Sequence, residues 1–293
     1  MNSLPAAIAS LVLVAGAFGG GAVLAVLPRH SQSAAAAQAL LRPIDLNPAA
    51  LQAKAAVLYD AQTGDILFQK NAQTAMPLAS LTKLMAAQAV LANRDPGTKI
   101  VITAADLKPE GDWGLRPGDA LPLGKLLEFG LVASCNDCFA AAASSLGSDY
   151  LSAMNGIAVT LNLTKTYFLN PTGLDLSKTD AGAYGSAFDV ARMTAGFYRQ
   201  YPAIFGLTTH RAASIEVGGR TLTAEATAAP LQDIPGFMGG KTGYTDLAGG
   251  NLAAVFDLTI GRPVVAVVLH STEAGRFADI RTLLAAARAA LAP

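Results

Sequence analysis

The sequence is poor in charged residues. Asp, Glu, Lys and Arg make up 14% of its 293 residues, against roughly 25% in an average soluble protein. The formal net charge is zero, and there is no basic run and no basic patch interleaved with aromatics. Nucleic-acid binding needs such a basic footprint, so nucleic acid is not expected as a partner. The length allows one large domain or two moderate ones.

Histidine and cysteine are also scarce. His30, His210 and His270 are far apart in the sequence, so they predict no cluster of metal ligands. The only cysteines, Cys135 and Cys138, form a C-x-x-C pair. A redox motif needs a thioredoxin-like strand-to-helix context, and a zinc site needs two further ligands. We therefore interpret the pair as two small buried thiols, with a local disulfide in an oxidising compartment as the alternative.

The first 28 residues contain no charged side chain. Residues 4–27 are apolar and numerous enough to span a bilayer, which predicts an exported protein. This stretch is longer than a usual signal core, which favours a retained anchor, although residues 37–39 offer an A-x-A cleavage signal. We expect residues 1–39 to be an anchor or signal segment with a short linker. Residues 40–293 would form the folded domain in the periplasm or on the outer face of the cytoplasmic membrane.

Hydrophobic periodicity predicts strands towards both ends of the chain and helices between them. This order predicts an α+β fold, in which an antiparallel sheet is flanked by helices and carries a mostly helical subdomain. Ser148 is a candidate helix cap, and Ser186 with Asp189 forms a capping-box pattern. The predicted strands are 56–60, 65–70, 211–217, 220–224, 236–242, 251–259 and 264–270. The predicted helices are 47–53, 84–92, 121–132, 137–146, 148–161, 190–201 and 277–291.

A hydroxyl and an amine occur where a helix is predicted to begin. Ser80 precedes the apolar run 84–92. Lys83 lies three residues after Ser80, which is nearly one helical turn. The two side chains should therefore lie side by side. A serine needs a neighbour to take its proton, and a lysine can do so if burial or a second cation keeps it neutral. A capping serine and a solvated lysine would give the same pattern, so other residues are needed to distinguish this structural role from a catalytic one.

Two further stretches carry polar residues of the same kind. Ser134 and Asn136 lie at the junction between two predicted helices. Lys241, Thr242 and Gly243 lie in a strand flanked by glycines, where alternation puts Lys241 and Gly243 on one face. The lysine can then point into a site, while the glycine leaves room for the backbone of a ligand. Without the other motifs, this stretch would be an ordinary glycine-rich edge strand.

The ordered motifs Ser-x-x-Lys, Ser-x-Asn and Lys-Thr-Gly resemble those of penicillin-binding proteins and serine β-lactamases. The residues around them, including 60–64, 76–83 and 170–174, are similar to the low-molecular-mass D-alanyl-D-alanine carboxypeptidases. The resemblance covers almost everything after residue 40. The middle motif departs from the usual pattern at Cys135 and Cys138, where family members have glycine and alanine.

The resemblance implies the chemical roles. Ser80 would be the acylated nucleophile, and Lys83 would take its proton. Ser134 would relay protons towards the leaving amine. Lys241 would keep Lys83 neutral, because a positive charge close by disfavours a second positive charge on Lys83.

The resemblance also implies the substrate contacts. Asn136 would bind the amide of the substrate, and Lys241 with Thr242 would attract its terminal carboxylate. The backbone N–H groups of the nucleophile and of Tyr244 would form the oxyanion hole. The peptide would pair with the edge of the strand that carries Gly243 and Tyr244.

The implied reaction is hydrolysis of the terminal D-Ala-D-Ala bond of peptidoglycan stem peptides through a Ser80 acyl-enzyme, with β-lactams as covalent inhibitors. It requires no metal and no cofactor. A D,D-endopeptidase that acts on cross-links is an alternative. A β-lactamase is a second one, although the only glutamates between Asn136 and Lys241 are Glu216 and Glu225, both in or beside a predicted hairpin. A non-catalytic protein that binds β-lactams or peptidoglycan is a third.

Overall fold

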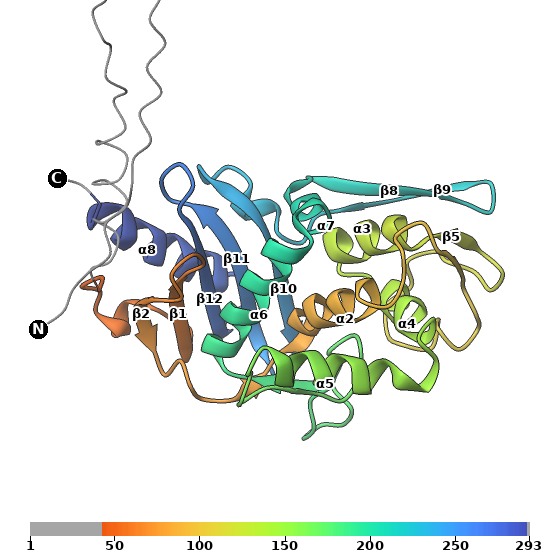
Figure 1. Ribbon diagram of the computed structural model, residues 1–293, viewed down its shortest axis with the longest axis horizontal. Coiled ribbons are helices and arrows are strands. Elements are labelled where there is room, and N and C mark those ends of the chain that lie inside the picture. Colours follow the sequence, from red (N-terminus) through yellow and green to blue (C-terminus); the bar gives the residue numbers. More distant parts are fainter. Residues whose placement is uncertain (1–42, 292–293) are drawn as a thin grey trace, which may run out of the picture.

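A computed structural model describes residues 43–291 of the chain (Figure 1). The predicted anchor or signal, residues 1–39, lies outside the described residues. Within residues 43–291, no helix has the length and the apolar composition needed to cross a membrane.

A five-stranded antiparallel sheet joins the first and last parts of the described chain. Its strand order is β10-β11-β12-β1-β2. The strands are β1 (Ala55–Asp60), β2 (Ile66–Lys70), β10 (Phe237–Thr245), β11 (Gly249–Asp257) and β12 (Pro263–Ser271). Strand β1, which lies between β12 and β2, is buried along its whole length, as expected for a sheet that is covered on both faces. Because β10 lies at one end of this order, its outer edge pairs with no other strand within residues 43–291.

Helices cover the two faces of this sheet (Figure 1). The C-terminal helix α8 (Gly275–Ala289) packs against one face, where Ile280 and Leu284 share a core with Leu58 and Val268. Helix α6 (Ala187–Gln200) packs against the other, where Val190 shares a core with Val57 and Val267. Neighbouring residues of β1 thus enter opposite cores, as the two-residue repeat of a strand requires.

A second region is mostly helical. It contains α2 (Thr82–Leu91), α3 (Leu123–Ala133), α4 (Asn136–Ser144), α5 (Tyr150–Thr160) and α7 (Pro202–Gly206). Helix α2 is buried from Thr82 to Val90 and contacts α4, α5 and α6. This burial explains its alanine-rich sequence, because a helix enclosed on all sides needs small apolar residues around its whole circumference.

Short paired strands complete this region. A small sheet joins β3 (Met76–Pro77), β7 (Ala183–Gly185) and β6 (Tyr167–Phe168). Two separate ladders are β4 (Lys99–Val101) with β5 (Ala120–Pro122), and β8 (Ala212–Val217) with β9 (Arg220–Glu225). Only the last of these ladders was predicted from the sequence.

The predicted α+β architecture is confirmed, with differences at several helix ends. The predicted helix 47–53 is a three-residue 3₁₀ turn, Pro48–Ala50. Ser148 does not cap α5, since a 3₁₀ turn containing it leads into that helix. The Ser186 hydroxyl does cap α6 by accepting from the Asp189 N–H at 3.1 Å. The Asp189 carboxylate instead accepts from the Lys165 N–H, so the capping box is only half formed.

Candidate active site

Ser80 and Lys83 lie side by side, as predicted. Ser80 is the middle residue of the 3₁₀ turn Ala79–Leu81, which leads directly into α2. Lys83 occupies the first turn of α2, and its Nζ lies 2.6 Å from Ser80 Oγ. The same Nζ donates to Asn136 Oδ1 at 2.7 Å and to the Thr172 carbonyl at 3.0 Å. The amine is therefore fixed in position against the hydroxyl.

Lys83 is completely buried. Burial lowers the pKa of its amine to about 7, because removal from water disfavours the charged form. Burial is the cause of this shift, and the expected effect of the Lys241 charge on Lys83 stays a prediction. Lys241 is buried as well, and its own pKa is lowered by burial first and then by the charges of Lys83 and Arg276.

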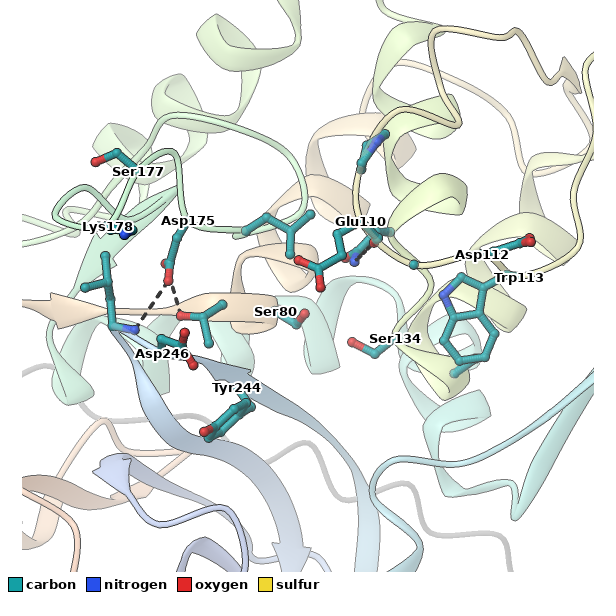
Figure 2. A pocket seen from close by; sticks show the side chains of 17 residues that line it. Ser80, Glu110, Asp112, Trp113, Ser134, Asp175, Ser177, Lys178, Tyr244 and Asp246 are labelled. Carbon is teal, nitrogen blue, oxygen red and sulfur yellow. Dashed lines mark hydrogen bonds between the residues drawn. The ribbon is translucent and has the colours of Figure 1, made fainter.

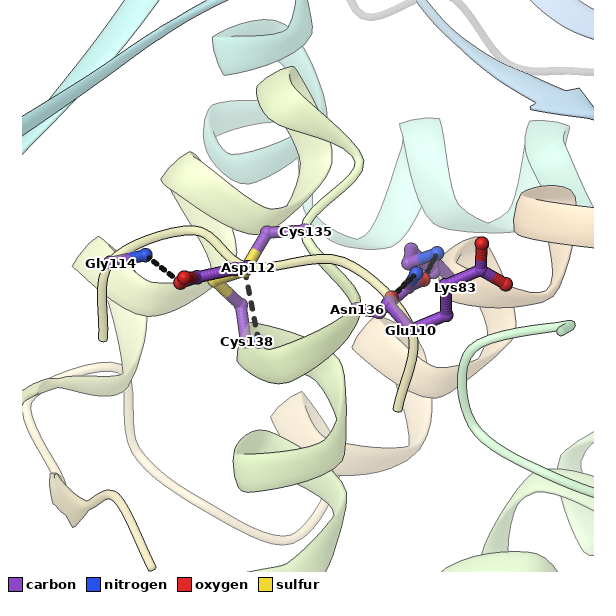
Figure 3. The surroundings of a disulfide bond; sticks show 7 residues. All are labelled: Lys83, Glu110, Asp112, Gly114, Cys135, Asn136 and Cys138. Atoms are coloured by element: carbon purple, nitrogen blue, oxygen red, sulfur yellow. Dashed lines mark hydrogen bonds between the residues drawn. A yellow bond between two sulfur atoms is a disulfide. The ribbon is translucent and has the colours of Figure 1, made fainter. Parts of the chain in front are cut away.

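The junction between α3 and α4 carries the middle motif. Ser134 ends α3 in the left-handed region, with φ of 63°, and so turns the chain sharply towards α4. Its Oγ accepts from Lys241 Nζ at 2.7 Å, which forms a second hydroxyl–amine pair. Asn136 accepts from Lys83 through Oδ1 and donates through Nδ2 to the Glu110 carbonyl at 2.6 Å (Figure 3). Both polar atoms of the Asn136 amide, which we expected to face the substrate, therefore have protein partners here.

The edge strand β10 brings the third motif to the same place. Thr242 is buried and donates through its hydroxyl to Thr227 Oγ1 at 2.7 Å. A Cβ on Gly243 would lie 3.0 Å from the Leu78 carbonyl oxygen and 3.1 Å from Ser80 N. The small size of Gly243 thus lets the Ser80 turn pack against β10. The room that we expected Gly243 to leave for the backbone of a ligand stays a prediction.

A cleft of about 1030 Å³ opens above these groups. Ser80, Ser134 and Tyr244 lie around the same opening (Figure 2). Residues 109–113 form one wall, and residues 174–178 and 244–247 form the other parts of the rim. Lys83 and Lys241 lie beneath this surface and reach it through their hydrogen-bond partners Ser80, Asn136 and Ser134, while Thr242 is buried in the neighbouring part of β10. The structure therefore brings all the predicted site residues together.

Three functional contacts were missed by the sequence analysis. The Thr172 carbonyl binds Lys83, the Glu110 carbonyl binds Asn136, and the Thr227 hydroxyl binds Thr242. Every residue has a backbone carbonyl, so the sequence does not show which carbonyl binds a side chain. The one available signal was the turn motif Asn170 to Gly173, which belongs to the family resemblance. Within residues 43–291, no three His, Cys, Asp or Glu side chains are placed to hold a metal ion.

Cys135 and Cys138 form a disulfide in the structure (Figure 3). Our first interpretation, two buried thiols, was therefore wrong, and the alternative is confirmed. Both residues are buried, and Cys135 is the N-cap of α4, where its Sγ accepts from the Cys138 N–H at 3.0 Å. The bond closes the first turn of α4 directly around Asn136, so it can stabilise the junction that positions this residue.

Removing the disulfide should lower stability and leave the fold intact. For the double variant Cys135→Ala/Cys138→Ala we expect the free energy of unfolding to fall by about 2 kcal/mol, as loop closure over so few residues predicts. Urea denaturation monitored by circular dichroism measures the change. Wild type treated with reductant should match the double variant. Equal stability of oxidised and reduced wild type would contradict the prediction.

Solved structures and curated sequences show to which proteins this chain is similar. Penicillin-Binding Protein D2 from Listeria monocytogenes, solved in the ampicillin-bound form, matches with a TM-score of 0.70 and 27% identity, over 81% of this chain and 97% of that one. D-alanyl-D-alanine carboxypeptidase DacF of Bacillus subtilis is 30% identical, over 80% of this chain and 61% of its own length. D-alanyl-D-alanine endopeptidase of Pseudomonas aeruginosa is 30% identical, over 75% of this chain and 72% of its own length.

The chain thus has the fold of the penicillin-binding proteins, and its two hydroxyl–amine pairs lie at the cleft. Residues 43–273 match the family model described as D-alanyl-D-alanine carboxypeptidase, and the chain belongs to this family. It spans 60% to 66% of the length of the first curated carboxypeptidases it matches.

Proposed function

We propose that the protein is a serine D,D-carboxypeptidase, which hydrolyses the terminal D-Ala-D-Ala bond of peptidoglycan stem peptides. The observation that carries the proposal is the 2.6 Å contact between Ser80 Oγ and the fully buried amine of Lys83, at the floor of an open cleft. Membership of the D-alanyl-D-alanine carboxypeptidase family supports the choice of substrate.

Lys83 acts as the base in the first step. As a neutral amine it can donate to Asn136 Oδ1 and to the Thr172 carbonyl, which leaves its lone pair directed at the Ser80 hydroxyl. The proton of Ser80 moves to Nζ as Oγ attacks the carbonyl carbon between the two D-alanines. The backbone N–H groups of Ser80 and Tyr244 stabilise the oxyanion that forms.

Ser134 and Lys241 serve the leaving group. Their 2.7 Å hydrogen bond holds the Ser134 hydroxyl, which passes the proton that Lys83 took from Ser80 on to the amine of the departing D-alanine, so that Lys83 is neutral again. The C–N bond then breaks and leaves an ester on Ser80. Lys241 and the hydroxyl of Thr242 lie beneath the place where the terminal carboxylate is held. Water hydrolyses the ester in the second half of the reaction and restores the Ser80 hydroxyl.

The free edge of β10 holds the peptide in an extended form. Since β10 pairs with β11 on one side only, its residues from Lys241 to Thr245 can add the stem peptide as a further strand. A β-lactam imitates the same dipeptide, enters the same place and stops at the acyl stage. The ampicillin-bound form of the similar Listeria protein supports this part of the proposal.

The test uses the full chain in mild detergent with an acetylated pentapeptide that ends in D-Ala-D-Ala. We expect release of one D-alanine per peptide, and with benzylpenicillin a lasting mass adduct on the proteolytic fragment that contains Ser80. Rapid release of hydrolysed drug without an adduct would support a β-lactamase. Neither adduct nor turnover from folded protein would overturn the proposal in favour of a binding protein.

Endopeptidase activity is a second candidate, because a relative of similar identity is named D-alanyl-D-alanine endopeptidase. A cross-linked muropeptide dimer distinguishes the two activities, since an endopeptidase would separate it into monomers. The β-lactamase alternative lacks support from Glu216 and Glu225. Both are exposed, on β8 and β9, and neither lines the cleft.

We propose further that residues 1–39 carry the catalytic domain, residues 40–293, to the outer face of the cytoplasmic membrane. Peptidoglycan lies on that side, and the disulfide fits an oxidising compartment. Detergent partitioning and sequencing of the mature N-terminus test the proposal. A mature chain that begins near residue 40 would show that the segment is cleaved and does not anchor the protein.

Acylation should depend on pH through Lys83. The neutral amine is the active form, and its pKa is lowered to about 7, so the acylation rate should rise with pH through about 7 and level off above it. The second-order rate constant for benzylpenicillin between pH 5 and 9 measures this. Burial also raises the pKa of the neighbouring Asp137 to about 6. Asp137→Asn is therefore the control, and loss of the rise in this variant would contradict the assignment to Lys83.

A further inference from the structure

Arg276 is a buried cation behind the strand that borders the cleft. It lies at the start of α8, is 6% exposed, and donates through a terminal guanidinium nitrogen to the Gly243 carbonyl at 2.9 Å. Its nearest carboxylate, Glu273, is 3.7 Å away and mostly exposed. Within residues 43–291 its Nε has no hydrogen-bond partner. A buried charge with so few partners lowers stability, which indicates a functional reason for its presence.

The carbonyl that Arg276 binds belongs to the same peptide unit as the Tyr244 N–H. A trans peptide is planar, and its C=O and N–H point in opposite directions. The Tyr244 N–H therefore points away from Arg276. Tyr244 lines the cleft next to Ser80, and a Cβ on Gly243 would approach Ser80 N to 3.1 Å. The peptide unit thus has the guanidinium on one side and the nucleophile on the other.

We propose that Arg276 is a positioning residue for the oxyanion hole: its guanidinium fixes and polarises the Gly243–Tyr244 peptide, so that the Tyr244 N–H binds the developing oxyanion more strongly. The inference rests on the proposed serine peptidase function. A hydrogen bond accepted by a carbonyl strengthens the N–H of the same amide as a donor, and a charged donor does so more than a neutral one. The positive charge behind the peptide also favours the negative oxygen in front of it.

Arg276 acts here without touching the substrate. It does not line the cleft, and its guanidinium stacks over the ring of Phe277, 5.0 Å from the centroid, on the α8 side of the strand. A residue that bound the terminal carboxylate would change substrate affinity. A residue that acts on the oxyanion hole should change the rate constants of acylation and of deacylation, since both steps pass through a tetrahedral oxyanion.

The test compares Arg276→Met and Arg276→Lys with wild type. Arg281→Met is the matched control, because Arg281 lies on the same helix, donates to the Pro230 carbonyl at 2.6 Å and does not line the cleft. Rapid-quench mass spectrometry with benzylpenicillin separates the dissociation constant from the acylation rate constant. Infrared difference spectroscopy reports the carbonyl stretch of the acyl-enzyme ester, which rises as its hydrogen bonds weaken.

For Arg276→Met we expect an acylation rate constant lower by about tenfold to a hundredfold, somewhat less than the loss of a whole oxyanion donor. The ester carbonyl stretch should move to higher frequency, with an unchanged dissociation constant. Arg276→Lys should recover part of both effects, and Arg281→Met should equal wild type.

Several results would overturn the proposal. Folded Arg276→Met with the rate constant and the carbonyl stretch of wild type would do so, as would weaker binding at an unchanged rate constant, which indicates a carboxylate-binding role. If Arg276→Met does not fold, Arg276→Lys decides alone, and an unchanged stretch in that variant counts against the proposal. Absence of acylation in wild type would refute the proposed function itself.

Discussion

Ser80→Ala is expected to form no covalent adduct with benzylpenicillin. D-alanine release from a pentapeptide should fall by about four orders of magnitude or more, as for the loss of a serine nucleophile elsewhere. The reason is that acylation needs the Ser80 oxygen, while Lys83, Ser134 and Lys241 supply only proton transfer and charge. Intact-mass spectrometry measures the adduct, and a coupled D-alanine assay measures the turnover.

The fold should survive this change, because alanine removes one oxygen from a half-buried turn residue. Ser177→Ala is the matched control. Ser177 also lines the cleft, but its hydroxyl bonds within the exposed segment Ser177–Asp180, so its adduct should form at the rate of wild type. A lasting adduct in Ser80→Ala, on any other side chain, would show that the nucleophile is misassigned.

Much of the site could be predicted from the sequence, because its key contacts are short in sequence or follow a regular period. Ser80 and Lys83 are three residues apart, so helical geometry places their side chains on one face, and the fold brings them to 2.6 Å by burying Lys83. The sheet strands could be predicted in the same way. The alternation and hydrophobicity of β1, β11 and β12 reflect burial against cores on either face.

Other features depend on segments that are distant in the sequence, and no local pattern predicts them. The Thr172 carbonyl, which accepts a hydrogen bond from Lys83, is 89 residues away from it in the sequence. Arg276 and Gly243, which are also hydrogen-bonded, are 33 residues apart. Gly243 was assigned only a role towards a ligand, because the packing of the Ser80 turn against β10 is a tertiary contact. The cysteine pair fits either a disulfide or two thiols by spacing alone, and only the geometry of the α4 turn distinguishes them.

Gly173→Ala should be among the most damaging changes outside the motif residues. Gly173 has φ of 81°, and an added Cβ would lie 1.8 Å from the Ala79 carbonyl oxygen and 2.6 Å from Thr82 Oγ1. The backbone of Ala79 cannot yield without moving Ser80. Overpacking and left-handed strain together predict a loss of about 2–5 kcal/mol in the free energy of unfolding.

Catalysis should suffer as much as stability. The turn at Gly173 also presents the Thr172 carbonyl to Lys83, so displacing it disturbs both the nucleophile and the base. Misplacing reacting groups by about 1 Å can lower a rate about a hundredfold. We therefore expect benzylpenicillin to acylate Gly173→Ala more slowly than wild type, by about a hundredfold or more.

Urea denaturation and the acylation rate constant, measured on folded protein, check the two effects. Gly156→Ala is the control, since Gly156 lies in α5 with no atom within 4 Å of an added Cβ. It should equal wild type in rate and be as stable or slightly more stable. Acylation by folded Gly173→Ala at the rate of wild type would show that the Ser80 turn does not depend on the Asn170–Leu174 turn behind it. The position of the nucleophile would then have to be set by α2 and β10 alone.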